Sequence, residues 1–233
     1  MKVLKIVFWV MFIGWGYLLS GCGKTEAEKH FRQGYEYYSQ GKYEQAIDEF
    51  QKVIEIDPNN SPAHYNLGLV YHMQGKLDDA VVAYQKTIDL DPDNSGAHNN
   101  LGNIYYQQGK PDDAMSALQQ AIEIDPNNLS GHLFLGAIYS KQGKLDDAIT
   151  KYKQILQIDP NCAVAHHDLG HFYHIQGKYE QAIAKYLHVI DLPPEEKYGD
   201  YLSSSAHYGL AGIYRKQGKV EEALAKFRQA IKT

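Results

Sequence analysis

Apolar residues recur at helical spacing along most of the chain, and two kinds of turn interrupt them at regular intervals. Leu67 and Tyr71 share one face of a predicted helix, and Ala80, Tyr84 and Ile88 share one face of the next, at spacings of four. This period is that of an α-helix and not of a strand. The pattern therefore predicts an all-α protein built from pairs of short helices.

Each predicted pair contains two turns. The first is Gln-Gly-Lys, in which glycine can adopt the left-handed conformation that ends a helix. Its glycines are Gly41, Gly75, Gly109, Gly143, Gly177 and Gly218. The second is Asp-Pro, in which proline stops the helix, at Pro58, Pro92, Pro126 and Pro160. The first four intervals between the glycines are 34 residues and the last is 41, so the chain is an array of two-helix repeats.

An apolar run from Ile6 to Leu19 precedes the array and follows Lys2 and Lys5. It is shorter than the ~20 residues that a membrane span needs. A positively charged start and a short apolar segment are typical of a secretory signal peptide. The alternative interpretation is an uncleaved anchor helix.

The apolar run ends in Leu19-Ser20-Gly21-Cys22, which resembles the lipobox of bacterial lipoproteins. The resemblance implies cleavage before Cys22 and acylation of that cysteine with fatty acids such as palmitate. Two or three acyl chains hold a protein stably on a membrane. Gly23, in place of aspartate, implies sorting to the outer membrane, facing the periplasm, where the host is Gram-negative.

Charge and composition narrow the range of functions. The formal net charge is −5 and no basic stripe is present, which argues against a nucleic-acid partner. The sequence contains no constellation of catalytic residues. Gly23-Lys24-Thr25 resembles the end of a phosphate-binding loop, but Leu18 stands where that loop needs glycine. We therefore expect neither an enzyme nor a bound cofactor.

The repeat resembles the tetratricopeptide repeat, whose pattern is Trp-x2-Leu-Gly-x2-Tyr, then Ala-x3-aromatic, then Pro. The second unit reads His64-x2-Leu67-Gly68-x2-Tyr71, Ala80-x3-Tyr84, Pro92. Histidine replaces the family's tryptophan in all six units, as His30, His64, His98, His132, His166 and His207; we expect these residues to be partly buried packing residues. The resemblance implies a right-handed superhelical solenoid of six helix hairpins.

These patterns divide the chain into five segments. They are a lipoprotein signal peptide at 1–21, a linker with the lipidated Cys22 at 22–26, repeats one to five at 27–196, an insertion at 197–203, and repeat six at 204–233. The final predicted helix carries Val220, Leu224 and Ile231, which are as apolar as their counterparts in internal repeats. We therefore expect it to contact another subunit, forming a homo-oligomer, or a partner protein.

In this family the first helix of each pair lines a concave groove that binds protein or peptide partners. The resemblance places the following residues in the groove: Phe31, Tyr35, Tyr38, Tyr65, Leu69, His72, Asn99, Asn103, Tyr106, His167, His171 and His174. The lysines of the family's peptide-carboxylate clamp are absent, because Tyr65, Asn99 and Leu133 hold the matching positions. An aromatic and amide-rich groove suits an extended or helical segment, held by stacking and hydrogen bonds to its backbone.

His167, His171 and His174 share one helix face. Two imidazoles four residues apart can bind a divalent metal, but positions seven apart are separated by about 10 Å, so one ion cannot meet all three. Cys162 or His166 could complete such a site. The alternative is a titratable groove wall whose partner affinity changes between about pH 5 and 7.

Six such repeats behind a lipobox resemble the pilotin-like and other envelope-assembly lipoproteins of the family. That resemblance implies a membrane-anchored scaffold in envelope, pilus or secretin assembly. A metal- or pH-responsive binding protein and a regulator of a cell-wall enzyme remain alternatives.

Overall fold

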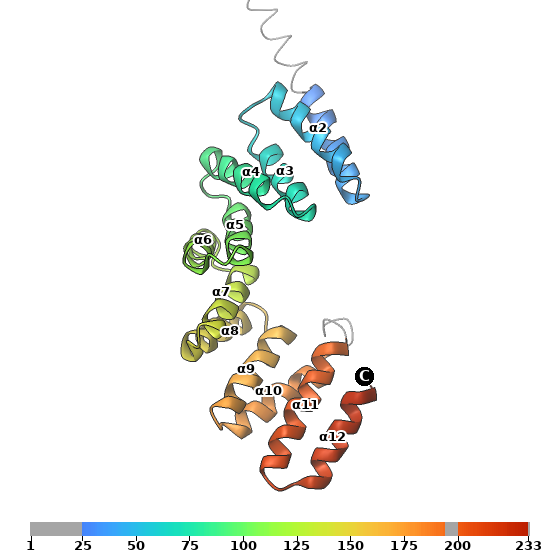
Figure 1. Cartoon of the computed structure of the whole chain (residues 1–233), viewed down its shortest axis with the longest axis vertical. Helices are drawn as coiled ribbons and strands as arrows, with labels where there is room; N and C mark the ends of the chain where they lie inside the picture. Colours follow the sequence, from blue (N-terminus) through green and yellow to red (C-terminus); the bar gives the residue numbers. More distant parts are fainter. Residues whose placement is uncertain (1–24, 194–199, 233) are drawn as a thin grey trace, which may run out of the picture. The chain divides into compact units, whose positions relative to one another are not determined.

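The computed structural model describes residues 25–193 and 200–232 (Figure 1). Every regular element in these ranges is a helix, which confirms the all-α prediction. Residues 25–39 form the first helix. The others are α2 (Tyr43–Ile56), α3 (Ser61–Met73), α4 (Leu77–Leu90), α5 (Ser95–Gln107), α6 (Pro111–Ile124), α7 (Leu129–Lys141), α8 (Leu145–Ile158), α9 (Ala163–Ile175), α10 (Tyr179–Asp191), α11 (Asp200–Lys216) and α12 (Val220–Lys232).

Two kinds of contact join the helices. Within a pair, the first helix packs against the second, as α3 does against α4 and α9 against α10. Between pairs, the second helix packs against the next first helix, as α2 does against α3 and α8 against α9. The helices fall into two compact units, with the boundary between Lys110 and Pro111. We call the helix 25–39, α3, α5, α7, α9 and α11 the first helices, and α2, α4, α6, α8, α10 and α12 the second helices.

Each Gln-Gly-Lys turn closes a pair in the same way. The glycines have positive φ angles between 71° and 76°, as the left-handed C-terminal turn requires. In the second repeat the Lys76 N–H donates to Tyr71 O at 2.9 Å. The Lys76 ammonium also lies 6.0 Å from the centre of the Tyr71 ring, a cation–π contact that recurs in other repeats.

The Asp-Pro turns before α3, α5 and α7 are each held by two side chains, the N-cap asparagine and a histidine of the following helix, whereas the turn before α9 has the histidine alone. Asn60 caps α3 by accepting a hydrogen bond from the Ala63 N–H at 3.0 Å. His64 Nε2 lies 3.0 Å from Pro58 O, so the ring donates its Nε2–H to this carbonyl. The same histidine–proline bond measures 3.1, 3.1 and 2.8 Å at His98, His132 and His166. These four histidines are partly or fully buried, as predicted, and each also binds the turn that precedes its helix.

The two helices of a pair cross closely because glycine faces an aromatic ring. A Cβ atom added to Gly68 would lie 2.7 Å from Tyr84 Cε1. Gly34 with Phe50, Gly136 with Tyr152 and Gly170 with Tyr186 repeat this arrangement, each with a closest approach of 2.9 Å. Gly68 thus stands at a close crossing of α3 and α4.

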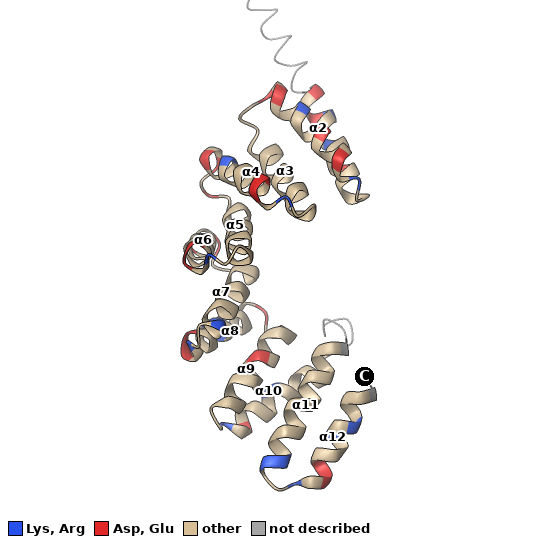
Figure 2. Cartoon of the chain, in the orientation of Figure 1, with Lys and Arg blue, Asp and Glu red and all other residues tan. Residues whose placement is uncertain are grey.

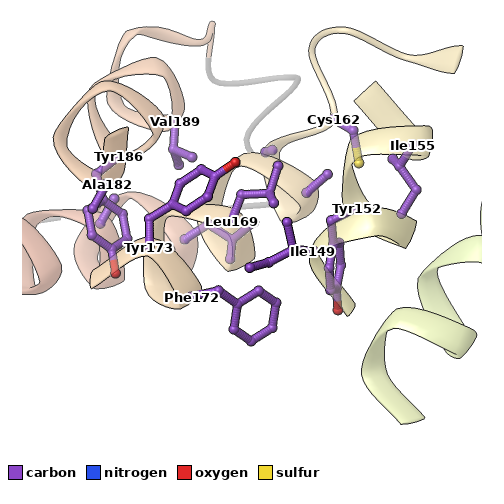
Figure 3. Packing of buried hydrophobic residues seen from close by; sticks show 14 of the residues in the cluster. Ile149, Tyr152, Ile155, Cys162, Leu169, Phe172, Tyr173, Ala182, Tyr186 and Val189 are labelled. Carbon is purple, nitrogen blue, oxygen red and sulfur yellow. The ribbon is translucent and has the colours of Figure 1, made fainter. Parts of the chain in front are cut away.

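The largest buried cluster lies in the second unit. Figure 3 shows Leu169 of α9 in its middle, with Ala182 and Tyr186 of α10 on one side and Ile149 and Tyr152 of α8 on the other. A first helix is thus buried between the second helices that precede and follow it. This sandwich fixes which face of each first helix remains available.

Three sequence predictions fall wholly or partly outside the described residues. They are the signal peptide, the lipidated Cys22 and the start of the insertion, since residues 1–24 and 194–199 are not described. The rest of the insertion belongs to α11, which begins at Asp200 and buries Leu202 and Ser203. No helix within the described ranges has the length and apolar character needed to cross a membrane.

Candidate functional site

The first helices of repeats two to five carry almost no charge. α3, α5, α7 and α9 together contain two charged residues, Lys141 and Asp168. Figure 2 shows Lys, Arg, Asp and Glu on the second helices and at the turns, whereas these four helices are almost entirely tan. In each unit the open faces of these helices therefore present mainly uncharged aromatic, amide and imidazole groups.

Two separate groups of hydrogen-bonded side chains link α3 and α5 in the first unit. Asn100 Nδ2 donates to the Tyr65 hydroxyl at 3.3 Å, and Gln107 Nε2 lies 3.2 Å from His72 Nε2. Gln107 also donates to Asn103 Oδ1 at 3.0 Å. Burial lowers the pKa of His72, so the ring is neutral at pH 7 and accepts the Gln107 hydrogen bond. The predicted residues His72 and Asn103 are thus brought together through Gln107, whereas Tyr65 is bound separately by Asn100.

These hydrogen bonds include two residues that the predicted groove leaves out, Asn100 and Gln107. Gln107 follows Asn103 by one helical turn, and that spacing is the signal that would have found it. Asn99 is half-buried, and its Oδ1 has no hydrogen-bond partner within the described part of the chain. Leu69 and Tyr106 are also half-buried, so every predicted position on α3 and α5 keeps some exposure.

The aromatic residues of the first repeat divide between packing and exposure. The Phe31 ring packs edge-on against Phe50 of α2, with ring centres 5.6 Å apart. Tyr38 lies between Tyr35 and Tyr43, at 6.4 and 6.3 Å. Tyr35 alone is largely exposed, at 57%. Phe31 and Tyr38 therefore belong to the packing of this repeat as much as to a binding surface.

In the second unit His167 links α9 to α11. Its Nδ1 lies 3.0 Å from Asp168 Oδ1, and its Nε2 lies 2.8 Å from Ser205 Oγ. This Asp–His–Ser order is the one used in acyl transfer, where backbone N–H groups must also stabilise an oxyanion. Ser205 lies in the second turn of α11, where backbone N–H groups bond within the helix. The arrangement therefore fits a link between two helices better than a nucleophile.

The other two histidines of this face point to different surroundings. His171 is exposed, whereas His174 is half-buried with its ring centre 6.0 Å from that of Tyr179. Burial lowers the pKa of His174. Within the described residues, no group of three or more His, Cys, Asp or Glu side chains is arranged to hold a metal ion.

Cys162 and His166, the other candidate metal ligands, lie at the start of α9 and take part in its packing. Cys162 is the N-cap residue of α9 and its side chain makes no cap bond, while burial raises the pKa of its thiol. His166 donates to Pro160 O, and its ring lies 3.8 Å from that of His188. Burial lowers the pKa of His166 to about 4. It is therefore uncharged at neutral pH.

Family models match nearly all of the array. A model described as TPR repeat matches residues 34–75, 73–109 and 136–177. Models described as tetratricopeptide repeat match residues 95–128, 117–150 and 161–233. No curated protein matches the chain.

Several solved structures share the fold. PilF of Pseudomonas aeruginosa superposes with a TM-score of 0.74 at 20% identity, covering 89% of this chain and 91% of its own. PilW, described as a widely conserved type IV pilus biogenesis factor, gives 0.67 at 19% identity, covering 87% and 91%. YrrB, described as a TPR protein with an unusual peptide-binding site, gives 0.59 at 24% identity, covering 74% and 89%.

Proposed function

We propose that this chain, which belongs to the tetratricopeptide repeat family, is a membrane-anchored scaffold that binds a segment of another protein on its first helices. Proteins of this family generally act as interaction scaffolds. The observation that carries the proposal is the low charge of the first helices in each unit: α3 and α5 in the first and α7 and α9 in the second hold two charged residues in total, beside many amide, phenol and imidazole groups.

Such a face suits the backbone of an uncharged peptide segment. Amide side chains both donate and accept hydrogen bonds, so they can pair with peptide N–H and C=O groups alike. Aromatic rings such as Tyr65 add stacking area with few rotatable bonds to immobilise. Tyr65 is already held by a hydrogen bond from Asn100, and His72 and Asn103 by hydrogen bonds to Gln107, which reduces the entropy lost on binding.

Membrane attachment is supported by the apolar run Ile6–Leu19 and by the lipobox at Cys22. Thr25 is already helical, and the three residues from Cys22 to Thr25 span at most about 10 Å. An acylated Cys22 would therefore hold the first repeat at the membrane surface. In a Gram-negative host we propose the periplasmic side of the outer membrane.

The process that we propose is the assembly of an envelope structure such as a pilus or its secretin. Support comes from PilW, a pilus biogenesis factor of the same fold and nearly the same extent, together with the lipobox of this chain. The partner segment would then belong to a component of that assembly.

Site-specific photocrosslinking in intact cells tests the binding face. A benzoylphenylalanine placed at Leu69 or Asn103 is expected to capture one partner, and the adduct should vanish when His72 and Gln107 are both changed to alanine. The matched control is Val82 on α4, which is 69% exposed but lies on a second helix. Equal adduct yields at Leu69 and Val82 would contradict the proposal.

Labelling with a palmitate analogue tests the anchor. Cys22→Ala should abolish incorporation and release the protein from membranes. Cys162→Ala is the matched control, because Cys162 is buried in the second unit and should leave labelling unchanged. Full labelling of the Cys22→Ala chain would rule out the lipoprotein assignment.

A further inference from the structure

The first helices use three equivalent positions to pack against the preceding second helix. In α9 these positions hold Ala165, Leu169 and Phe172, with exposed fractions of 0%, 0% and 3%. The same positions are buried in the other first helices of repeats two to six: Ala63, Leu67 and Val70; Ala97, Leu101 and Ile104; Gly131, Leu135 and Ile138; Ala206, Leu210 and Ile213. In the helix 25–39 they are Lys29, Gln33 and Glu36. That helix alone has a polar face here.

The second helices supply the opposite side of this contact. In α10 it is formed by Tyr179, Ile183 and Ile190, which are partly buried against the core that α11 completes. The equivalent residues of α12 are Val220, Leu224 and Ile231, with exposed fractions of 59%, 43% and 76%. They form one stripe along α12, which we call the α12 stripe. No helix of the described residues covers it.

We propose that the α12 stripe pairs with the α12 stripe of a second copy of this chain, with the two helices antiparallel. A second copy has no first helix to offer, because the packing positions of repeats two to six are already buried within it. Its helix 25–39 presents Lys29, Gln33 and Glu36, which would leave apolar residues facing charges. Head-to-tail association of copies is therefore disfavoured. The arrangement that remains is a two-fold contact between the α12 stripes of two copies.

Charge favours the antiparallel arrangement. Glu221 and Arg228 are exposed and lie on the same side of the stripe, about 80–100° around the helix from Val220. In an antiparallel two-fold pair, residues on the same side of both helices meet in reverse order. Each Glu221 then approaches Arg228 of the second copy, twice in the dimer. A parallel two-fold pair would instead place the two Glu221 residues on opposite sides of the interface, and likewise the two Arg228 residues, so this pairing of opposite charges would be lost.

The mass of the full chain in mild detergent tests this pairing by light scattering over a dilution series. One helix pair is a small interface, so we expect dimers at about 500 µM that dissociate on dilution. Leu224→Lys should abolish the dimer without changing the circular dichroism spectrum, because the residue is exposed. A chain that stays monomeric throughout the series overturns the proposal.

Charge reversal tests the geometry. Glu221→Arg or Arg228→Glu alone should weaken the dimer about tenfold, and the two together should restore it to within about threefold. The matched control is Glu222→Arg, which makes the same change in the same helical turn but on the side opposite the stripe; it should leave the dimer unchanged. Failure of the double variant to recover overturns the antiparallel pairing. Photocrosslinking from Leu69 is unaffected by any of these results, so the two proposals fail separately.

Discussion

At the scale of single residues, the turns between repeats depend on two side chains. Asparagine caps the first helix, and histidine binds the proline carbonyl six residues before it. The fourth such turn departs from this pattern, because Cys162 stands where Asn60, Asn94 and Asn128 stand elsewhere. The α9 helix therefore begins without a side-chain cap. This departure allows a direct measurement of what the cap contributes.

Replacing Cys162 by asparagine should raise the free energy of unfolding by about 1 kcal/mol, the usual value of an N-cap. The Asn side chain would accept from the Ala165 N–H, as Asn128 accepts from the Gly131 N–H at 2.8 Å. Urea denaturation measures the change. Asn128→Cys is the reciprocal control and should lower the free energy by a similar amount. Two changes of the same sign would show that burial of the thiol, and not capping, dominates.

His166 should make the protein less stable in mild acid. Burial lowers its pKa to about 4 in the folded chain, whereas an unfolded histidine titrates near 6.5. Below pH 6.5 the unfolded state therefore binds more protons than the folded state. The free energy of unfolding falls as the pH drops from 6.5 to about 4. Between pH 7 and pH 5 this residue alone should remove about 2 kcal/mol from the unfolding free energy.

Urea denaturation at both pH values measures this loss, and His166→Gln should reduce it. Glutamine can still donate to Pro160 O but does not titrate. His171→Gln is the control, because His171 is exposed. An equal pH dependence in wild type and His166→Gln would contradict the assignment. His72 and His174, whose pKa values burial also lowers, contribute in the same direction.

At the scale of the helix pair, the closest contact is between a glycine and an aromatic ring. Gly68 lets α3 approach α4 until the Tyr84 ring fills the space that a Cβ would occupy. Glycine weakens the helix itself by about 1 kcal/mol relative to alanine. The close crossing compensates by burying Tyr84 completely. Helix propensity and packing therefore predict opposite effects of the same substitution.

At Gly68 we expect the packing effect to be larger than the effect of helix propensity. Gly68→Ala would place a methyl group 2.7 Å from Tyr84 Cε1, and we expect a net loss of about 1–3 kcal/mol of stability from overpacking. Gly212→Ala is the matched control, because its nearest neighbour is His174 Cε1 at 3.3 Å, on a side chain that can rotate. Thermal denaturation compares the two. A Gly68→Ala protein as stable as wild type would show that the helices separate at little cost.

At the scale of the whole molecule, charge is divided between the two sets of helices. The second helices and turns hold most of the acidic and basic residues, while α3, α5, α7 and α9 are nearly neutral (Figure 2). A binding face without charge cannot select its partner by long-range attraction.

Partner binding should therefore be nearly independent of salt. For the segment captured from Leu69, we expect the dissociation constant to change less than about twofold between about 50 and 500 mM salt, because few exposed charges are there to be screened. Leu69→Lys is a control that should introduce salt dependence toward acidic segments. A tenfold weakening of wild-type binding in high salt would show that charged residues of the second helices take part.

The sequence predicts most of the fold because its signals are local. Glycine and proline mark the turns, and Gly68 with Tyr84 marks the crossing. The proposed binding face is predicted less completely. Asn103 and His72 follow from the repeat, but the contact between His167 and Ser205 depends on where α11 begins, inside the 41-residue interval. The 34-residue period does not predict this contact, because the last interval is seven residues longer. The histidine–proline bond also escapes prediction, because it needs the folded turn to bring the two residues together.

The matching turns before α3, α5 and α7 have a consequence for how this protein changes over generations. Removal of residues 95–128 would join Asn94 directly to Leu129, and the new junction would again offer an asparagine to cap Gly131 and a Pro92 carbonyl to receive His132. A single recombination event between two copies of the repeat would therefore yield a shorter gene, or a longer one, whose product folds at every junction. The number of repeats can therefore change over generations to match the length of the partner segment that we propose.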